Sequence, residues 1–159
     1  MEWMDKTNEQ LKRGAFLMVS ENPMTIGWGQ FGIIWGKQTF SVYVRKSRYT
    51  HTLLEHAETF TVSVPFYGTM TKELGFCGTR SGRDINKMQE LSASLFPAQF
   101  GGQEGFKGCQ FHIECRILFR AELDEHTLHD PALVSRYYAG GDPHTMLIGE
   151  VLGISEEHA

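Results

Sequence analysis

Two short segments of the sequence carry residue types that bind phosphate groups. The first places three cations within four positions, with two hydroxyls beside them, and reads Arg45-Lys46-Ser47-Arg48-Tyr49-Thr50. An arginine can fork onto two phosphate oxygens, and hydroxyls donate hydrogen bonds to the same group. The following helical spacing predicts a helix over 48–57 with Ser47 as its N-cap, which would also point main-chain amides at an anion. A solvated basic turn explains the composition equally well.

The second segment reads Thr79-Arg80-Ser81-Gly82-Arg83-Asp84 and is followed by Lys87. It repeats the combination of hydroxyls, glycine and arginines ahead of an expected short helix. Because the formal net charge of the chain is -4, two such turns favour one shared anionic ligand. The alternative is a surface feature in which Asp84 caps the helix and pairs with Lys87 for about 0.3 to 0.5 kcal/mol.

Large aromatic side chains follow a proline-fixed polar turn at Asn22-Pro23-Met24-Thr25. Trp28 and Trp35 have rings large enough to flank a planar cofactor, as many small-molecule sites require. Aromatic residues in glycine-rich strands more often belong to a core, so composition alone favours a packing role.

Three other patterns lack the context that their chemistry needs. Gly27-Trp28-Gly29-Gln30-Phe31-Gly32 spells GxGxxG, but a dinucleotide fingerprint requires a following helix, and strand-type residues continue to Val44. The stretch 126–130 contains two histidines without cysteine pairs or HExxH spacing, so a solvated loop explains it better than a metal site. The sequence contains no GxSxG elbow, which leaves a hydrolase without a nucleophile motif. We expect no metal and no catalytic side chain.

The elements that would position these segments are mostly strands. Apolar or period-two runs predict strands at 15–20, 40–45, 60–64 and 145–154, and glycine-punctuated aromatic residues predict a kinked or bulged strand pair over 24–36. Asn22-Pro23 is expected to break the chain before that pair. Short helices are predicted at 4–13, 48–57, 70–76 and 86–91 and in a stretch ending at Tyr138.

The clearest alternation runs from Cys109 to Leu123, with Phe111 on the apolar face and His112 and Glu114 on the polar face. Such a strand would span about 50 Å at about 3.3 Å per residue, more than the width of a domain this size, so it must curl, bulge or change neighbours. A nearly closed barrel supplies that curvature. The predicted fold class is mainly β (α+β), an antiparallel barrel of about seven strands with a few short helices.

Composition sets the broad class of the protein. The 159 residues suffice for a single domain, 1–159, and 17 glycines favour a β-rich fold, since glycine supplies tight turns. The acidic net charge argues against nucleic-acid binding. The charged start and the lack of a run of about 20 apolar residues argue against a secretory signal or membrane span, so we expect a cytoplasmic protein. Cys77, Cys109 and Cys115 form no CxxC pair and are expected to be buried free thiols.

Five segments follow one another along the chain: Asn22–Trp28, Val44–Thr50, Phe60–Val62, Gly78–Asp84 and His144–Val151, the last containing Ile148-Gly149-Glu150-Val151. Together they resemble the flavin reductase-like FMN-binding split barrels, and within that family they are most similar to the flavoredoxin-like subgroup. The resemblance covers nearly the whole chain, from Phe16 to Ile154.

The resemblance implies a Greek-key split β-barrel of six or seven strands, a homodimer, and FMN at or near the subunit interface. In that family the segment matching 22–28 lines the isoalloxazine ring, the segment matching 45–50 holds the phosphate and ring edge, and the segment matching 81–87 adds phosphate and ribityl contacts. His144 falls where a nicotinamide could approach the flavin in some relatives. The residues assigned to FMN are Asn22, Met24, Thr25, Trp28, Arg45, Lys46, Ser47, Arg48, Tyr49, Thr50, Thr79, Ser81, Gly82, Lys87 and His144.

We therefore expect an FMN-dependent oxidoreductase that takes electrons from NAD(P)H or from a redox-protein partner. The protein would bind and orient the cofactor and tune its potential, with Lys46, Arg48 or Thr50 stabilising the reduced ring. One rival hypothesis is a flavoredoxin-type electron carrier that does not react with nicotinamides. Another is a non-redox split barrel that retains heme or pyridoxal phosphate instead of flavin.

Overall fold

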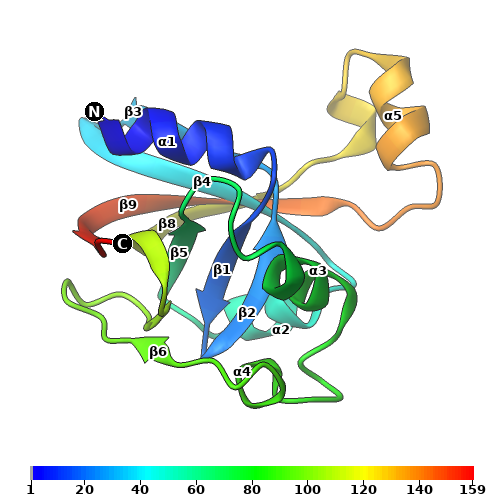
Figure 1. The fold of residues 1–159 in the computed structure, drawn as a ribbon. Coiled ribbons are helices and arrows are strands. Elements are labelled where there is room, and N and C mark those ends of the chain that lie inside the picture. Colours follow the sequence, from blue (N-terminus) through cyan, green and yellow to red (C-terminus); the bar gives the residue numbers. More distant parts are fainter. Residues whose placement is uncertain (1) are drawn as a thin grey trace.

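Seven antiparallel strands form the sheet that carries the site. The computed structural model describes residues 2–159, and the strands follow one another across the sheet in the order β2-β1-β5-β8-β9-β4-β3 (Figure 1). The seven strands are β1 (Ala15–Val19), β2 (Asn22–Ile26), β3 (Gly29–Ile34), β4 (Lys37–Arg45), β5 (Thr59–Pro65), β8 (Cys109–Glu122) and β9 (His144–Glu156). Two further short strands, β6 (Leu95–Phe96) and β7 (Gly105–Phe106), pair with each other.

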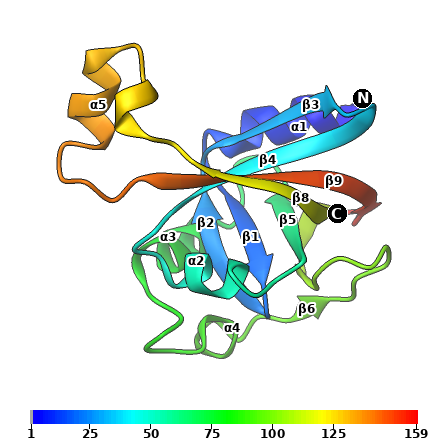
Figure 2. The same cartoon turned by 180° about the vertical axis from the view of Figure 1, so that it is seen from behind.

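The two edge strands of the large sheet are consecutive in the chain. β2 ends at Ile26 and β3 begins at Gly29, so Gly27 and Trp28 alone connect one edge to the other. This connection can reach roughly 11 Å at most, and the sheet must therefore curl until its edges approach each other (Figures 1 and 2). The predicted antiparallel barrel-type fold is confirmed, and Trp28 lies at the seam of the barrel.

Strand β1 is buried on both of its faces. Leu17 and Val19 belong to the core inside the curled sheet. Phe16 and Met18 point the opposite way because side chains alternate along a strand, and they belong to a second core under the helices. The Phe16 ring stacks on Phe106 with 4.2 Å between centroids. This double burial explains why 15–20 is a continuous apolar run instead of an alternating one.

The predicted chain break at Asn22-Pro23 is wrong, because both residues lie in β2, opposite Val19 and Met18 of β1. The turn comes immediately before them, at Ser20 and Glu21, whose φ angles are 49° and 62°. Two consecutive positive φ angles suit a tight hairpin. Proline cannot donate a hydrogen bond within a sheet, but the edge position of β2 tolerates it.

The long strand β8 curls as its length requires. It pairs with β5 and β9, and its register shifts between Glu114 and Cys115 and again between Ile117 and Phe119. Each shift marks a bulge or irregularity, and bulges bend a strand and increase its local twist. The expectation of a bulged and curled strand is confirmed.

The polar face of β8 is not solvent-exposed at His112 and Glu114, which are each 1% exposed. The segment between β6 and β7 covers this face of the strand. Main-chain amides of that segment donate three hydrogen bonds of 2.8–2.9 Å to the Glu114 carboxylate, from Gln99, Phe100 and Gly102. Local alternation placed the polar side chains correctly on one face, but a distant segment buries that face.

The helices are short and lie around the barrel. They are α1 (Glu2–Leu11), α2 (Tyr49–Leu54), α3 (Thr71–Thr79), α4 (Lys87–Glu90), α5 (Pro131–Tyr137) and the 3-10 turn η1 (Glu125–Thr127). α5 stands away from the sheet in both views (Figures 1 and 2). Within residues 2–159, none of these helices has the length and apolar character to cross a bilayer. The three cysteines are buried and free, as expected.

Candidate functional site

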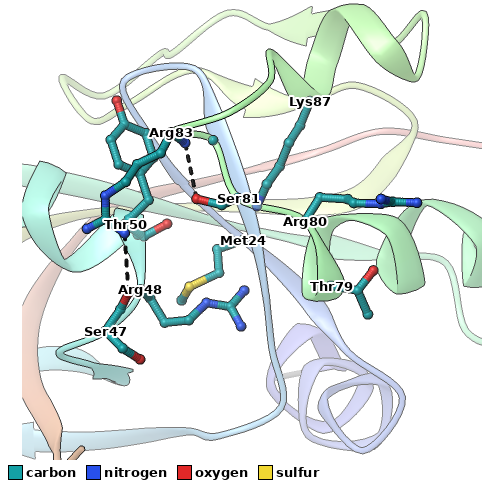
Figure 3. Close-up of a pocket in the computed structure, with 11 residues that line it drawn as sticks. Met24, Ser47, Arg48, Thr50, Thr79, Arg80, Ser81, Arg83 and Lys87 are labelled. Atoms are coloured by element: carbon teal, nitrogen blue, oxygen red, sulfur yellow. Dashed lines mark hydrogen bonds between the residues drawn. The ribbon is translucent and has the colours of Figure 1, made fainter.

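The two basic turns meet around one cavity of about 220 Å³, which we call the basic cavity. Ser47 and Ser81 both line it, and the two turns lie on either side of the Met24 side chain (Figure 3). The predicted convergence of the two turns is therefore confirmed. The lining residues are Met24, Ser47, Arg48, Tyr49, Thr50, Thr79, Arg80, Ser81, Gly82, Arg83 and Lys87.

The first turn is held by the segment that leads into β9. The Arg45 guanidinium donates to the main-chain oxygens of Asp142 and Tyr137, at 2.8 and 3.0 Å. The Ser47 amide and hydroxyl donate to the Asp142 carboxylate at 3.0 and 2.5 Å. Partial burial acts to raise the pKa of Asp142, but the two Ser47 hydrogen bonds and the Arg45 charge lower it overall. Arg45 and Ser47 thus fix the shape of the turn.

Ser47 is not the N-cap of α2. Arg48 occupies that position without a side-chain capping bond, because the Ser47 hydroxyl is directed to Asp142. Thr50 is instead tied to β2, since the Asn22 side-chain amide donates to its hydroxyl at 3.2 Å in a buried contact. The Thr50 hydroxyl accepts in that bond, so its own hydrogen remains able to bind another acceptor.

The second turn rests on a buried ammonium group. Lys87 is 3% exposed, and its Nζ donates to the main-chain oxygens of Pro23 and Cys77 at 2.8 and 2.9 Å. Burial lowers the pKa of Lys87 to about 8, against the opposing influence of Cys77, and the Arg48 charge lowers it further. The alternative pairing of Lys87 with Asp84 is therefore wrong, and Asn86, not Asp84, caps α4.

A glycine is required where the second turn approaches the first. A Cβ atom on Gly82 would lie 2.1 Å from the Asn22 side-chain oxygen and 2.8 Å from the Tyr49 ring. Both distances are far below van der Waals contact, so a side chain at this position would push the turns apart. Gly82 therefore sets the width of the basic cavity.

A second cavity, of about 330 Å³, lies against aromatic side chains, and we call it the aromatic cavity. The Trp28 ring is 4.5 Å from the His144 ring and 5.1 Å from the Tyr137 ring between centroids. Trp28 itself is 39% exposed. The lining residues are Met24, Thr25, Ile26, Gly27, Trp28, Tyr43, Arg45, Arg48, Tyr137 and His144.

His144 is neutral at physiological pH. Its Nδ1 is hydrogen-bonded to the Tyr138 hydroxyl at 2.8 Å. Burial lowers the pKa of His144 to about 4, the nearby Arg45 guanidinium lowers it too, and Asp142 opposes the shift. The aromatic cavity therefore presents an uncharged imidazole beside the exposed tryptophan ring.

Two residues, Met24 and Arg48, line both cavities. The Arg48 guanidinium donates to the Gly78 oxygen at 3.3 Å, and burial lowers the pKa of Arg48 against the opposing influence of Asp142. A ligand that contacts this arginine can extend into the basic cavity at one end and the aromatic cavity at the other. The site suits an elongated molecule with an anionic end and a flat, apolar end.

Two of the predicted site residues lie outside both cavities. Lys46 forms an ion pair with Glu122 at the end of β8 and is exposed, so the structure does not place its charge beside either cavity. Asn22 donates a hydrogen bond to the Thr50 hydroxyl and lines a neighbouring cavity. Trp35, considered as a second cofactor-flanking ring, lies in the β3–β4 turn and is 55% exposed. The other predicted residues line one or both cavities.

Several lining residues were not among the predicted ones. Arg80 and Arg83 belong to the second basic segment, so their charge and position were visible in the sequence. Tyr43 alternates with the buried residues of β4, and that period-two pattern indicated a side chain on the outer face. Tyr137 had no sequence signal, because the fold of the 124–143 segment brings it to Trp28. Within residues 2–159, no cluster of three metal-binding side chains is found.

Comparison with known proteins identifies related sequences and folds. A family model described as the flavin reductase like domain matches residues 14–159. An uncharacterized protein of Archaeoglobus fulgidus is 35% identical over 118 residues, which cover 72% of this chain and 66% of that protein, just under two thirds of its length.

Solved structures share the fold at low sequence identity. Flavoredoxin from Methanosarcina acetivorans has a TM-score of 0.69 at 22% identity, covering 91% of this chain and 68% of that chain. Flavoredoxin of Desulfovibrio vulgaris (Miyazaki F) has a TM-score of 0.70 at 18% identity, with coverages of 91% and 69%. The FMN-binding protein from Thermus thermophilus with bound p-hydroxybenzaldehyde has a TM-score of 0.68 at 23% identity, with coverages of 91% and 71%.

Proposed function

The chain belongs to the flavin reductase-like family, and from this premise we propose that it binds FMN across the two cavities and serves as a flavin-dependent oxidoreductase. The observation that carries the proposal is the junction at Arg48, which lines both the basic and the aromatic cavity. FMN has a phosphate at one end and a planar ring at the other, which matches the order of the two cavities.

The residues present fit such a ligand. In the basic cavity, the Ser81 hydroxyl would donate to the phosphate, since the Ser81 oxygen accepts from the Arg83 amide at 3.2 Å and keeps its hydrogen for another acceptor. In the aromatic cavity, Trp28 and His144 would lie against the ring. Gly82 allows the two turns to approach, because a Cβ there would clash with Asn22 and Tyr49.

Bound FMN would supply the redox chemistry, by accepting a hydride or single electrons and passing them to an acceptor. The chain's own residues bind and orient it. Arg48 is the cation that would stabilise negative charge on the reduced ring, because it reaches the aromatic cavity as well as the basic one. Lys46 is no longer a candidate for this role, since its ammonium pairs with Glu122.

The test is a titration of the flavin-free protein with FMN, followed by its absorbance and fluorescence. We expect binding in the wild type and a dissociation constant at least tenfold higher in Arg48→Ala, because one cation at the junction of the cavities is lost. Lys46→Ala removes the same charge from the same turn outside both cavities, so it should stay within about twofold of the wild type. A wild-type protein that shows no spectral change on adding FMN would contradict the proposal.

The electron donor is proposed to be a reduced nicotinamide or a redox protein. The partly exposed Trp28 ring supports access of a second reactant to the aromatic cavity. Stopped-flow mixing of the FMN-loaded protein with NADH and NADPH separates the two cases. Rapid bleaching of the flavin identifies a nicotinamide-dependent reductase, whereas no bleaching identifies a flavoredoxin-type electron carrier.

We further propose that the protein is a homodimer. Trp35 and Phe119 are 55% and 42% exposed, and their rings lie 6.3 Å apart on neighbouring parts of the surface. Ile33, 74% exposed, lies on the same hairpin as Trp35. Exposed apolar patches of this kind often mark protein–protein contacts. Light scattering after gel filtration tests the mass, and a monomer at micromolar concentration would contradict it.

A further inference from the structure

A third cavity, of about 350 Å³, adjoins the basic cavity, and we call it the outer cavity. Four residues, Tyr49, Gly82, Arg83 and Lys87, line both the basic and the outer cavity and so form the wall between them. The remaining lining residues of the outer cavity are Ser20, Glu21, Asn22, Leu53, Asp84, Ile85 and Asn86. The space beyond the wall is larger than the basic cavity itself.

Two members of this wall are fixed in place. Gly82 is wedged between Asn22 and Tyr49, where even a methyl group would clash. Lys87 is buried and donates to two main-chain oxygens on different elements. Neither residue can move without disturbing β2 or α3, because their contacts are part of the packed structure.

Arg83 is the exposed charged member of the wall. Its side chain is exposed and extends from the second turn toward the first (Figure 3). One guanidinium nitrogen donates to the Thr52 hydroxyl at 3.2 Å and the other to the Ser47 oxygen at 3.5 Å. The guanidinium carbon lies 5.6 Å from the centre of the Tyr49 ring. These are individually weak contacts, and together they hold the side chain across the gap between the two turns.

We infer that Arg83 closes the phosphate end of the site and so selects a flavin mononucleotide over a flavin dinucleotide. The inference rests on the proposed function. A dinucleotide such as FAD carries an adenylate group joined through the same phosphate, and that group must leave the basic cavity beyond the phosphate. The outer cavity adjoins the basic cavity at the wall of four shared residues, and the Arg83 side chain reaches from the second turn to the first at that wall.

Charge does not explain the selection by itself. A phosphomonoester carries close to two negative charges at pH 7, and the pyrophosphate of FAD carries two, so the attraction of Arg83 for either ligand is similar. The two ligands differ in the volume that they occupy beyond the first phosphate, because FMN ends there and FAD continues into the adenylate group. Glu21 and Asp84 also line the outer cavity. Their negative charge disfavours a second phosphate there and therefore adds to the preference for FMN over FAD.

The experiment measures the dissociation constants of FMN and FAD for the flavin-free full-length protein and compares their ratio between variants. We expect the wild type to favour FMN, and Arg83→Ala to lower the FAD-to-FMN ratio at least fivefold because the wall is opened. Arg83→Gln keeps most of the side-chain length without the charge, so both affinities should fall while the ratio stays within about twofold. Lys46→Ala removes a cation from the first turn outside the cavities, where it pairs with Glu122, and should leave the ratio unchanged.

Three results overturn the inference. An unchanged ratio in Arg83→Ala shows that the side chain is no barrier, and a raised ratio shows that Arg83 clamps the dinucleotide instead. A wild type that binds FAD as tightly as FMN also removes the inference while leaving the proposed flavin binding intact. If the wild type binds neither flavin, the proposed function itself fails. Because Arg83 is exposed, we expect all three variants to fold, which circular dichroism verifies.

Discussion

His112 and His144 are both buried, but the structure uses their rings in different ways. His112 has both ring nitrogens occupied, with Nδ1 2.9 Å from the Ser63 hydroxyl and Nε2 2.8 Å from the Glu157 carboxylate. Its ring stacks on Phe96 at 4.1 Å between centroids. His144 is bonded through Nδ1 to the Tyr138 hydroxyl, and its ring lies beside Trp28 at the aromatic cavity.

These surroundings indicate that His112 stabilises the fold, whereas His144 is placed to contact a ligand in the aromatic cavity. The Ser63–His112–Glu157 series contains the residue types of a hydrolase triad, but Ser63 and His112 are fully buried and the serine oxygen also accepts from the Phe106 amide at 2.9 Å. A nucleophile must reach a substrate, so this cluster ties β5, β7 and β8 to the C-terminal residues instead. Burial and residue type are shared by the two histidines, and the neighbouring cavity distinguishes them.

The largest expected effect is on stability, from His112→Ala. The substitution leaves Ser63 and Glu157 without their common partner and opens a cavity under Phe96, so we expect a loss of roughly 3 kcal/mol in the free energy of unfolding. Urea unfolding followed by circular dichroism measures it. A loss below 1 kcal/mol would contradict a structural role for this ring.

The second prediction concerns acid stability. Because burial lowers the pKa of His144 to about 4 in the folded protein, the unfolded chain takes up a proton near pH 6.5 that the folded chain does not. The contribution of neutral His144 to the free energy of unfolding is fully present above about pH 6.5 and is lost as the pH falls toward 4. Between pH 7 and pH 5 we expect the wild type to lose about 2 kcal/mol more than His144→Gln. Equal losses in the two proteins would argue against a depressed pKa.

The third prediction separates the two rings by ligand binding. His144→Ala removes a ring from the wall of the aromatic cavity, and we expect the FMN dissociation constant to rise about tenfold, which corresponds to about 1.4 kcal/mol. His112→Gln, which retains hydrogen-bonding capacity far from both cavities, serves as the matched control and should bind FMN like the wild type. Fluorescence titration measures both. If the His112 variant loses more affinity than the His144 variant, the comparison is wrong.

The smallest effect is expected from Tyr138→Phe. It removes the hydroxyl that orients His144 while keeping the buried ring, so we expect FMN affinity to fall only two- to threefold, below about 1 kcal/mol. Fluorescence titration measures the affinity, with His144→Ala as the reference for complete loss of the ring. Affinity identical to that of the wild type would show that Tyr138 does not position the ring.

Much of the fold and part of the site could be predicted from local patterns. The alternation over 109–123 predicted a strand too long to be straight, and the register shifts of β8 confirm its curl. The two basic segments predicted a shared cavity, because each contained the cations and hydroxyls that an anion requires. Pro23 was misjudged because proline excludes a central strand but not an edge strand, and edge position is a property of the whole sheet.

What the sequence by itself determined is the chemistry of the two turns and the strand periods that flank them, since both depend on residues close together in the chain. Only the tertiary structure decided which polar groups already have a bonding partner elsewhere in the fold. Lys46 pairs with Glu122, Ser47 donates to Asp142, and Lys87 donates to two main-chain oxygens. It also decided which buried histidine faces a cavity. These outcomes depend on contacts between different elements of the fold, and the spacing of residues along one strand or turn does not predict such contacts.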